Sequence, residues 1–311
     1  MTRRVFLSGF SQVETRAGVV ADDFSPSSLV AGQQPKPGAT ESSRDLRRID
    51  VFARLAMRAA DTAIQVSGID LNSMDRSRCG VVVGSALGGF HSALTQLGRL
   101  QQSGPTRVSP FFIPGLMVNA SSGSIASRWN LTGPAPGVAR CHFPILDAVI
   151  SSASFIRDGI IESAICGTAD AFPNSVSRAT MFVLQSETSL SDLQPPSLEL
   201  TSWASGPDGQ STEADCLTQD CLQMPEFSVR DAYPDALNVA SLLSQADQTA
   251  SRLYETVRAI CRPGEPAHAD PESTGRVLPD FCERLNGEPG FVLLTQSSQR
   301  HAVSLSLREV P

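Results

Sequence analysis

Lysine is almost missing from this chain of 311 residues: Lys36 is the only one, so arginine carries nearly all of the positive charge. The formal net charge is -7, and no stretch gathers the arginines into the kind of patch that holds a nucleic-acid backbone. The composition therefore argues against DNA or RNA as a partner.

Long hydrophobic runs are also missing. The apolar run near the N-terminus is broken at Ser8 and Gly9, which makes it too short for a signal peptide. No uninterrupted apolar stretch reaches the roughly 18 residues of a membrane helix. We therefore expect a soluble, cytoplasmic protein with no membrane partner.

Cysteine pairing is not indicated either, because the seven cysteines are odd in number and scattered along a large chain. Cys79 and Cys166 adjoin apolar, strand-like runs, so we expect them in the core. Cys216 and Cys221 have four residues between them and no matching second pair, which does not favour zinc. We expect no metal and no cofactor.

What is present is a hydrophobic content of 41%, enough for one large domain or two ordinary ones. Apolar spacing predicts a strand over 3–8, a helix over 50–68, a buried strand from 79 that enters a glycine-rich turn, and a helix over 144–159. A buried strand over 160–166, ended by Gly167, follows that helix. This alternation predicts an α/β domain with a mostly buried sheet.

The second half gives weaker signals. Short strands are predicted over 181–184 and 197–200, and polar loops over 204–235 and 263–277. Residues 239–260 repeat apolar side chains at helical spacing, and a face packed on the sheet is favoured over an interface coiled coil, which needs more heptads. Two strands over 291–295 and 302–307 could pair as a terminal hairpin.

Four segments, 47–64, 80–90, 108–136 and 148–172, follow one another as in the N-terminal half of β-ketoacyl synthases, and SPFFIP with the later LTGP is the most specific part. The resemblance implies a thiolase-like, five-layered αβαβα fold, shortened especially in its C-terminal half. It implies a single domain over 1–311, with a ketosynthase-like half at 1–175 and a reduced half at 176–311. Members of this family typically dimerise.

The family's nucleophile is a cysteine in T-A-C-x-S-G at the head of a buried helix, where the helix dipole stabilises a thiolate. Counted without gaps from LTGP, His142 stands at the nucleophile's place and Cys141 stands one residue early. Phe143 and Pro144 replace small residues that come next in the family, and Pro144 suits the first position of a helix.

Three interpretations remain open. His142 replaces the nucleophile, and acyl transfer through cysteine is lost. Alternatively, Cys141 is the nucleophile after a one-residue shift, although adjacent side chains diverge and make a Cys–His hydrogen bond difficult. In the third interpretation, both residues are only buried in a remodelled loop. We favour the first.

The family's two histidine motifs, H-G-T-x-T and K-S-x-x-G-H, drive decarboxylation and stabilise the enolate. The histidines of this chain stand in neither motif; they are His91, His142, His268 and His301. The resemblance thus favours a chain-length-factor-like subunit that pairs with a catalytic ketosynthase in polyketide, aryl-polyene-like or fatty-acid-type biosynthesis. Alternatives are an acyl-thioester transferase or hydrolase that uses Cys141, and a free-standing acyl-binding homodimer.

By position in the family, four apolar residues are candidates for the acyl tunnel and the subunit interface, with ordinary core packing as the alternative. They are Leu87, Phe111, Phe112 and Phe143. Arginines at the start of the first helix could meet an acidic acyl carrier protein, although such a cluster is often only a solvated helix start. They are Arg44, Arg47 and Arg48.

Overall fold

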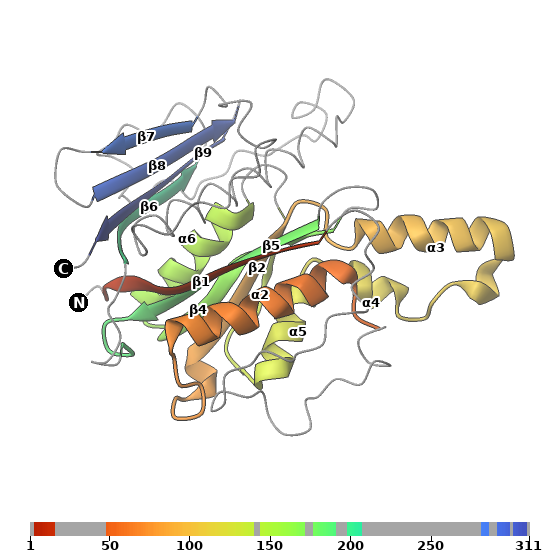
Figure 1. The fold of residues 1–311 in the computed structure, drawn as a ribbon, viewed down its shortest axis with the longest axis horizontal. Coiled ribbons are helices and arrows are strands. Elements are labelled where there is room, and N and C mark those ends of the chain that lie inside the picture. The colour runs from red at the N-terminus through yellow and green to blue at the C-terminus, as the bar shows by residue number, and fades with distance from the viewer. Residues whose placement is uncertain are drawn as a thin grey trace.

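The computed structural model describes residues 3–15, 48–139, 144–171, 177–190, 198–206, 281–285, 291–298 and 301–309. The strands of these residues form one sheet in the order β3-β2-β4-β5-β1-β6-β9-β8-β7 (Figure 1). The strands are β1 (Val5–Thr15), β2 (Cys79–Ser85), β3 (Gly137–Ala139), β4 (Ser163–Asp170), β5 (Ser177–Ser186), β6 (Leu198–Gly206), β7 (Phe281–Leu285), β8 (Phe291–Ser298) and β9 (His301–Glu309). The helices are α2 (Val51–Ser67), α3 (Phe90–Ser103), α4 (Phe112–Leu116), α5 (Ala120–Trp129) and α6 (Pro144–Arg157), with 3-10 turns η2 (Arg76–Arg78) and η3 (Pro105–Arg107).

The centre of the sheet is buried on both faces. β2 pairs in parallel with β3 and with β4, and every residue of β2 and β4 is buried. Val81 and Val83 face a core formed with α2 and α5, whereas Val82 faces a core formed with α6. Helices on both faces of parallel strands explain why these strands are apolar throughout. The described residues thus form three of the five predicted layers, and the buried strand at 79 is confirmed.

Helix α2 begins and ends where its sequence predicts. The carboxylate of Asp50 accepts a hydrogen bond from the Phe52 N–H at 3.1 Å, and Gly68 ends the helix in the left-handed conformation at φ 63°. Small residues form much of the buried face of this helix, so it packs closely against β1. A Cβ at Gly9 of β1 would lie 2.4 Å from the Ala63 carbonyl oxygen.

That contact corrects the predicted end of the first strand. β1 does not stop at residue 8 but continues to Thr15, with a register shift between Leu7 and Gly9. Gly9 therefore serves the close approach of a helix rather than a turn. A second glycine was misread in the same way: Gly167 lies inside β4, where a Cβ would be 2.0 Å from the Thr180 carbonyl oxygen of β5.

The later strands extend the sheet. β5 and β6 cover the two short strands predicted near 181 and 198 and are longer than expected, and β6 includes the first residues of a predicted loop. β8 and β9 pair antiparallel, which confirms the terminal hairpin, and β7 adds a strand that was not predicted. The helix predicted over 239–260 and the loop over 263–277 lie outside the described residues.

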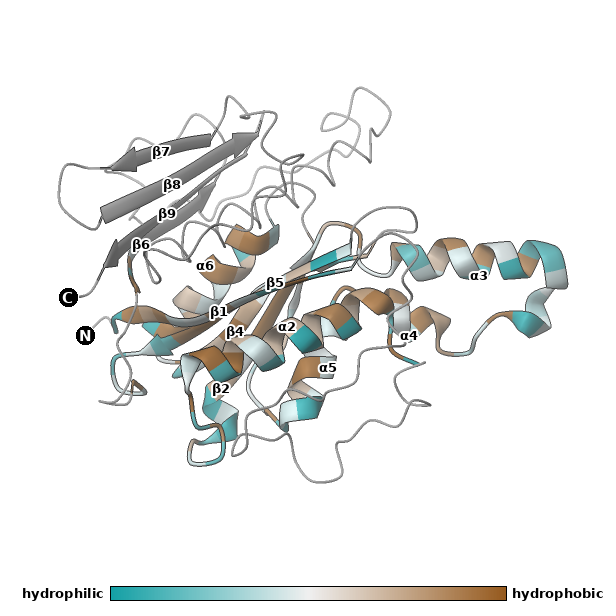
Figure 2. Ribbon diagram, viewed as in Figure 1, coloured by the Kyte–Doolittle hydropathy of each residue, from teal (hydrophilic) through white to brown (hydrophobic). Residues whose placement is uncertain are grey.

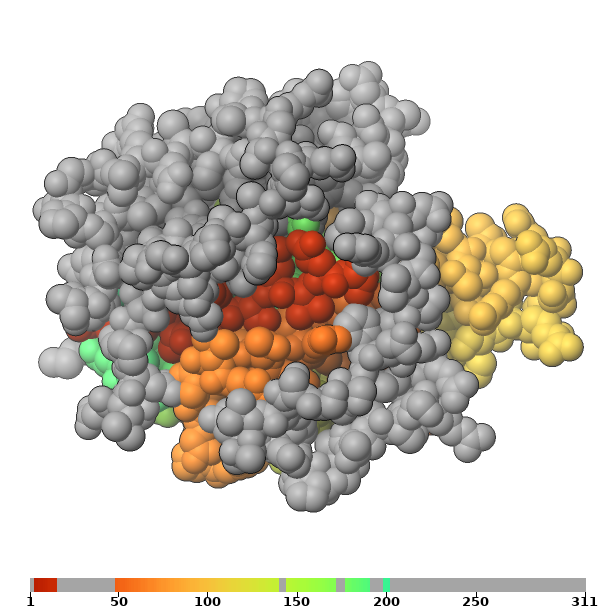
Figure 3. Space-filling view, in the orientation of Figure 1, coloured from red at the N-terminus to blue at the C-terminus, as the bar shows by residue number. Residues whose placement is uncertain are grey.

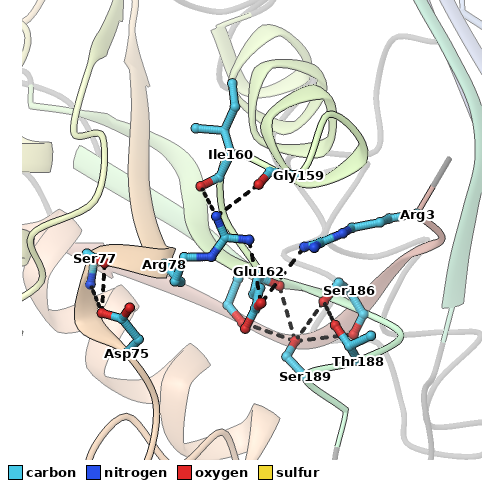
Figure 4. Close-up of polar contacts among 11 residues, drawn as sticks. Arg3, Asp75, Ser77, Arg78, Gly159, Ile160, Glu162, Ser186, Thr188 and Ser189 are labelled. Atoms are coloured by element: carbon cyan, nitrogen blue, oxygen red, sulfur yellow. Dashed lines mark hydrogen bonds and ion pairs between the residues drawn. The ribbon is translucent and has the colours of Figure 1, made fainter. Parts of the chain in front are cut away.

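Arg78, which directly precedes β2, binds the backbone just beyond the C-terminal end of α6 (Figure 4). Arg78 Nη1 donates hydrogen bonds to the carbonyl oxygens of Gly159, at 2.9 Å, and Ile160, at 2.8 Å, just after α6 ends. Its Nη2 lies 3.5 Å from Glu162 Oε1, and Arg3 Nη1 lies 3.9 Å from the same oxygen. A cation at a helix C-terminus satisfies carbonyls that have no partner within the helix.

A buried ion pair joins α2 to α5. Arg128 Nη2 lies 2.9 Å from Asp61 Oδ2, and Trp129 Nε1 donates to Asp61 Oδ1 at 2.9 Å. Burial raises the pKa of Asp61, and the hydrogen bonds from Arg128 and Trp129 oppose that rise. Each charge is thus tolerated in the core only because the other is present.

We expect Asp61→Ala to lower the free energy of unfolding by about 3–5 kcal/mol, because it leaves the Arg128 guanidinium buried without its counter-charge. The double variant Asp61→Ala/Arg128→Met should recover at least ~1 kcal/mol, since it buries no unpaired charge. Urea unfolding followed by circular dichroism measures both values. A double variant no more stable than the single one would contradict the role given to this pair.

Candidate functional site at the carboxyl edge of the sheet

The carboxyl ends of β2, β3 and β4 meet at one edge of the sheet, because these strands run parallel. In open α/β sheets, this edge is where ligands bind. β3 ends at Ala139 and α6 begins at Pro144, so the predicted helix start is confirmed. The connection, residues 140–143, lies outside the described residues, and the predictions for Cys141, His142 and Phe143 stay predictions.

The backbones at this edge approach one another too closely for side chains. A Cβ at Gly84 would lie 2.3 Å from the Pro144 carbonyl oxygen, and one at Gly137 would lie 2.6 Å from the Asn119 backbone nitrogen. These contacts set the start of α6 directly against the end of β2. Close backbone contacts, and not side chains, therefore set the relative positions of the elements around the site.

A carboxylate already occupies the first turn of α6. Asp147 is 6% exposed there. A negative charge near a helix N-terminus offsets the positive end of the helix dipole, which is what a thiolate nucleophile at that end would use. Sequence reasoning missed this feature, although an acidic residue three positions after the predicted first helical residue was its signal.

A second carboxylate holds the turn at the end of β2. Asp170 Oδ1, at the last residue of β4, accepts hydrogen bonds from the Ser85 hydroxyl at 2.6 Å, the Ala86 N–H at 3.0 Å and the Leu87 N–H at 3.2 Å. The Gly88 N–H in turn donates to Ser85 Oγ at 2.7 Å. We call residues 85–89 the glycine turn. The role of Asp170 was also not predicted from the sequence, because its partners lie some 85 residues earlier in the chain.

The predicted tunnel and docking residues that are described lie beside this turn. Leu87 belongs to the turn and is half-buried, and Phe112 is half-buried at the start of α4. Phe111 is 43% exposed, and the Arg48 guanidinium carbon lies 4.9 Å from the centre of its ring. This cation–π contact brings one docking candidate and one tunnel candidate together. Arg44 and Arg47 lie outside the described residues.

Beyond the glycine turn, α3, η3 and α4 form an arm over residues 90–117 that projects from the body of the molecule (Figures 1 and 3). In the described part of the chain, nine large apolar side chains are exposed, and seven of them lie on the arm. They are Phe90, Leu94, Leu97, Leu100, Phe111, Ile113 and Met117. Figure 2 shows apolar and polar residues alternating along α3. Helix α3 was not predicted from the sequence, although Phe90, Leu94 and Leu97 have helical spacing.

The base of the arm rests on the N-terminus of α2. A Cβ at Gly115 of α4 would lie 4.0 Å from the Asp50 Cβ. Burial raises the pKa of Asp50, while the side chain of Ser92, the Phe52 N–H and the charges of His91 and Arg54 oppose the rise. His91 and Ser92 belong to the first turn of α3, so Asp50 lies beside the base of both helices of the arm.

Replacing Asp50 by Asn keeps an oxygen that can cap α2 but removes the titrating group. Folded wild-type protein holds the Asp50 proton more tightly than the unfolded chain does. Its contribution to stability is therefore full below the ordinary carboxyl pKa and is lost as pH rises through the raised pKa. We expect the unfolding free energy of wild type minus that of Asp50→Asn to fall with rising pH in this window. Urea titrations at several pH values measure it, and a difference that rises would contradict the assignment.

Neither a metal cluster nor a membrane span is found in the described ranges. No group of three or more His, Cys, Asp or Glu side chains there could hold a metal ion. No helix there has the length and apolar content needed to cross a bilayer. The thiols of Cys79 and Cys166 are fully buried, which raises the pKa of each to about 12, as expected for core cysteines.

Comparison with known proteins gives a family match. Residues 26–187, just over half of the chain, match the family model described as β-ketoacyl synthase, N-terminal domain. Among curated proteins, the chain is 32% identical over 131 residues to 3-oxoacyl-(acyl-carrier-protein) synthase 2 of Coxiella burnetii, covering 42% of this chain and 32% of the relative. The corresponding protein of Vibrio cholerae is 30% identical over 129 residues, covering 42% of this chain and 31% of the relative. The matched region thus spans about a third of the length of these relatives.

Solved structures match over the whole chain. The ishigamide ketosynthase/chain length factor has a TM-score of 0.66 at 18% identity and is covered in full, as is this chain. A type II polyketide synthase acyl-carrier protein in complex with its ketosynthase, bound to the hexaketide, has a TM-score of 0.63 at 15% identity, again with full coverage of both chains. The likeness shows the thiolase-like fold that the sequence predicts.

Proposed function

Because the chain belongs to the β-ketoacyl synthase family, we propose that it is a ketosynthase-like subunit that does not itself condense acyl chains. It pairs with an active ketosynthase in polyketide, aryl-polyene-like or fatty-acid-type biosynthesis and shapes the tunnel that holds the acyl chain. Leu87, Phe111, Phe112 and Phe143 are the proposed tunnel and interface residues.

The apolar arm is the observation that carries the proposal. Monomeric proteins rarely expose large contiguous apolar patches, and such patches mark interaction sites. Leu97 is 50% exposed, Met117 is 53% exposed and Ile113 is 64% exposed. The same surface is free of negative charge, since no Asp or Glu occurs between Asp75 and Asp147. Few charged groups and many apolar ones are typical of the core of a protein–protein interface.

Missing catalytic groups support the non-condensing part of the proposal. The family's cysteine position aligns with His142, and the K-S-x-x-G-H lysine has no counterpart, because Lys36 lies far upstream. Asp147 disfavours an anionic intermediate at the head of α6. Without a thiolate or the two histidines, neither acyl transfer nor decarboxylation has its usual groups.

An acyl carrier protein is the second proposed partner. One of the solved structures with this fold is a ketosynthase in complex with such a carrier. Arg48 lies at the base of the arm, stacked on Phe111, and Arg44 and Arg47 precede it closely in sequence. Guanidinium groups bind phosphate and carboxylate groups well, which suits an acidic partner.

Co-expression with a catalytic ketosynthase from the same source tests the pairing. A tagged form of this chain should co-purify with the ketosynthase as a heterodimer, seen by native mass spectrometry. Leu97→Glu should weaken the complex by at least about tenfold, because it buries a charge in an apolar interface. Ile160→Glu is the matched control, since Ile160 is 49% exposed but lies off the arm. A homodimer with no heterodimer, or equal effects of both variants, would reject the proposal.

The alternative function, acyl transfer or thioester hydrolysis through Cys141, is tested by exposing purified protein to a labelled acyl thioester. We expect no covalent adduct at Cys141. Cys79 and Cys166 serve as internal controls, because buried thiols with a pKa of about 12 should stay unlabelled while the protein is folded. An adduct that is lost in Cys141→Ser would favour the enzyme over the non-condensing subunit.

A further inference from the structure

We propose that Asp170 is a positioning residue: its carboxylate fixes the glycine turn and, through that turn, the base of the arm. The effect on partner binding rests on the proposed function, whereas the effect on the turn does not. The family resemblance pointed to the nucleophile position and to apolar tunnel residues, and it assigned no role to this carboxylate.

The contacts of Asp170 converge from one side. Oδ1 accepts three hydrogen bonds, from the Ser85 hydroxyl and from two consecutive backbone N–H groups, and Oδ2 lies 3.3 Å from the Ala86 nitrogen. Consecutive N–H groups that point to one place form a nest that suits an anion. Here the chain fills that nest with its own carboxylate, which is 8% exposed.

A carboxylate is the side chain that this arrangement requires. The groups of the glycine turn that contact it are all donors, and an ionised carboxylate is an acceptor only. Hydrogen bonds to a charged acceptor are also shorter and stronger than those between neutral groups. In Asn the amide oxygen can take the place of Oδ1, but the amide NH2 then takes the place of Oδ2 and faces the Ala86 N–H, so two donors oppose each other in a buried position.

The glycine turn packs directly against the backbone of α4, so the position of the turn determines the position of that helix. Gly88 adopts a left-handed conformation at φ 55°, and a Cβ there would lie 3.3 Å from the Leu116 carbonyl oxygen. A Cβ at Gly89 would lie 2.5 Å from the Gly115 carbonyl oxygen. Since α3 begins at Phe90, the turn holds both helices of the arm at their shared base.

A second side chain of β4, that of Thr168, holds the last residues of β2 independently of Asp170. Thr168 Oγ1 of β4 donates to the Gly84 carbonyl oxygen at 2.9 Å, and the two strands remain paired up to Gly84 and Thr168. β2 is therefore fixed up to its last residues without Asp170. The carboxylate controls only the turn beyond Gly84, which makes its effect separable from the stability of the sheet.

The test compares Asp170→Asn with Asp158→Asn, which removes an exposed carboxylate after the end of α6. Hydrogen exchange in Asp170→Asn should be faster by about tenfold or more at Ala86, Leu87 and Gly88, and should rise across α4. The amides of Val81–Val83 should change by less than about threefold, because the strand pairing is intact. Ser85→Ala removes the hydroxyl that links Asp170 to Gly88, so its effect should have the same direction and be smaller.

In the heterodimer with the ketosynthase, Asp170→Asn should weaken pairing by about tenfold, and Asp158→Asn should leave it within about twofold of wild type. Unchanged exchange in the turn in both Asp170→Asn and Ser85→Ala would overturn the positioning role. Faster exchange with unchanged pairing would overturn its consequence for the partner. If wild-type protein forms no heterodimer, the proposed function fails while the exchange data still decide the role of Asp170.

Discussion

No side chain fits between the carboxyl end of β2 and the first residue of α6, and the rest of the edge depends on that contact. Gly84 meets the Pro144 carbonyl oxygen there. Gly137 meets Asn119 in the same way, and Gly89 meets Gly115. Each contact joins backbone to backbone, so the strands, α4 and the head of α6 hold one another in place without any reactive side chain. Any larger residue at these glycines would force the elements apart, because packed interiors have no room to absorb it.

Buried carboxylates connect the elements that the glycines bring close. Asp61 joins α2 to α5, Asp170 joins β4 to the glycine turn, and Asp50 caps α2 where that helix meets the base of the arm. A buried charge is costly unless donors surround it, so such groups specify one arrangement more than they stabilise it. The protein thus uses short polar links where helices and turns must keep a defined place against the sheet.

Local sequence signals account for some of these elements and not for others. The buried strand at 79, the helix after Asp50 and the helix from Pro144 were predictable, because local spacing and capping residues determine them. Gly9 and Gly167 were misread, since a glycine that admits a neighbouring backbone looks the same in sequence as one that ends a strand. The role of Asp170 could not be predicted from local sequence, because its contacts with the glycine turn depend on the pairing of β4 with β2, which are distant in sequence. The family resemblance supplied the fold, which periodicity could not.

Under the proposed function, the same architecture would let a member of this family lose its chemistry and keep its shape. The described glycine contacts, the Asp61 pair and the Asp170 links involve neither a cysteine nor a histidine side chain, so the proposed replacement of the family's catalytic residues would leave this frame intact. Under the proposed function, partner binding depends instead on the exposed face of the arm, which carries Leu97, Ile113 and Met117. If the chain does not condense acyl groups, as proposed, a carboxylate such as Asp147 is compatible with the first turn of α6, because no thiolate there would need the helix dipole. The link from the sheet edge to the arm is the feature that such a subunit would have to keep, because the proposed partner would need that surface in a defined position and would not depend on the chemistry of the site behind it.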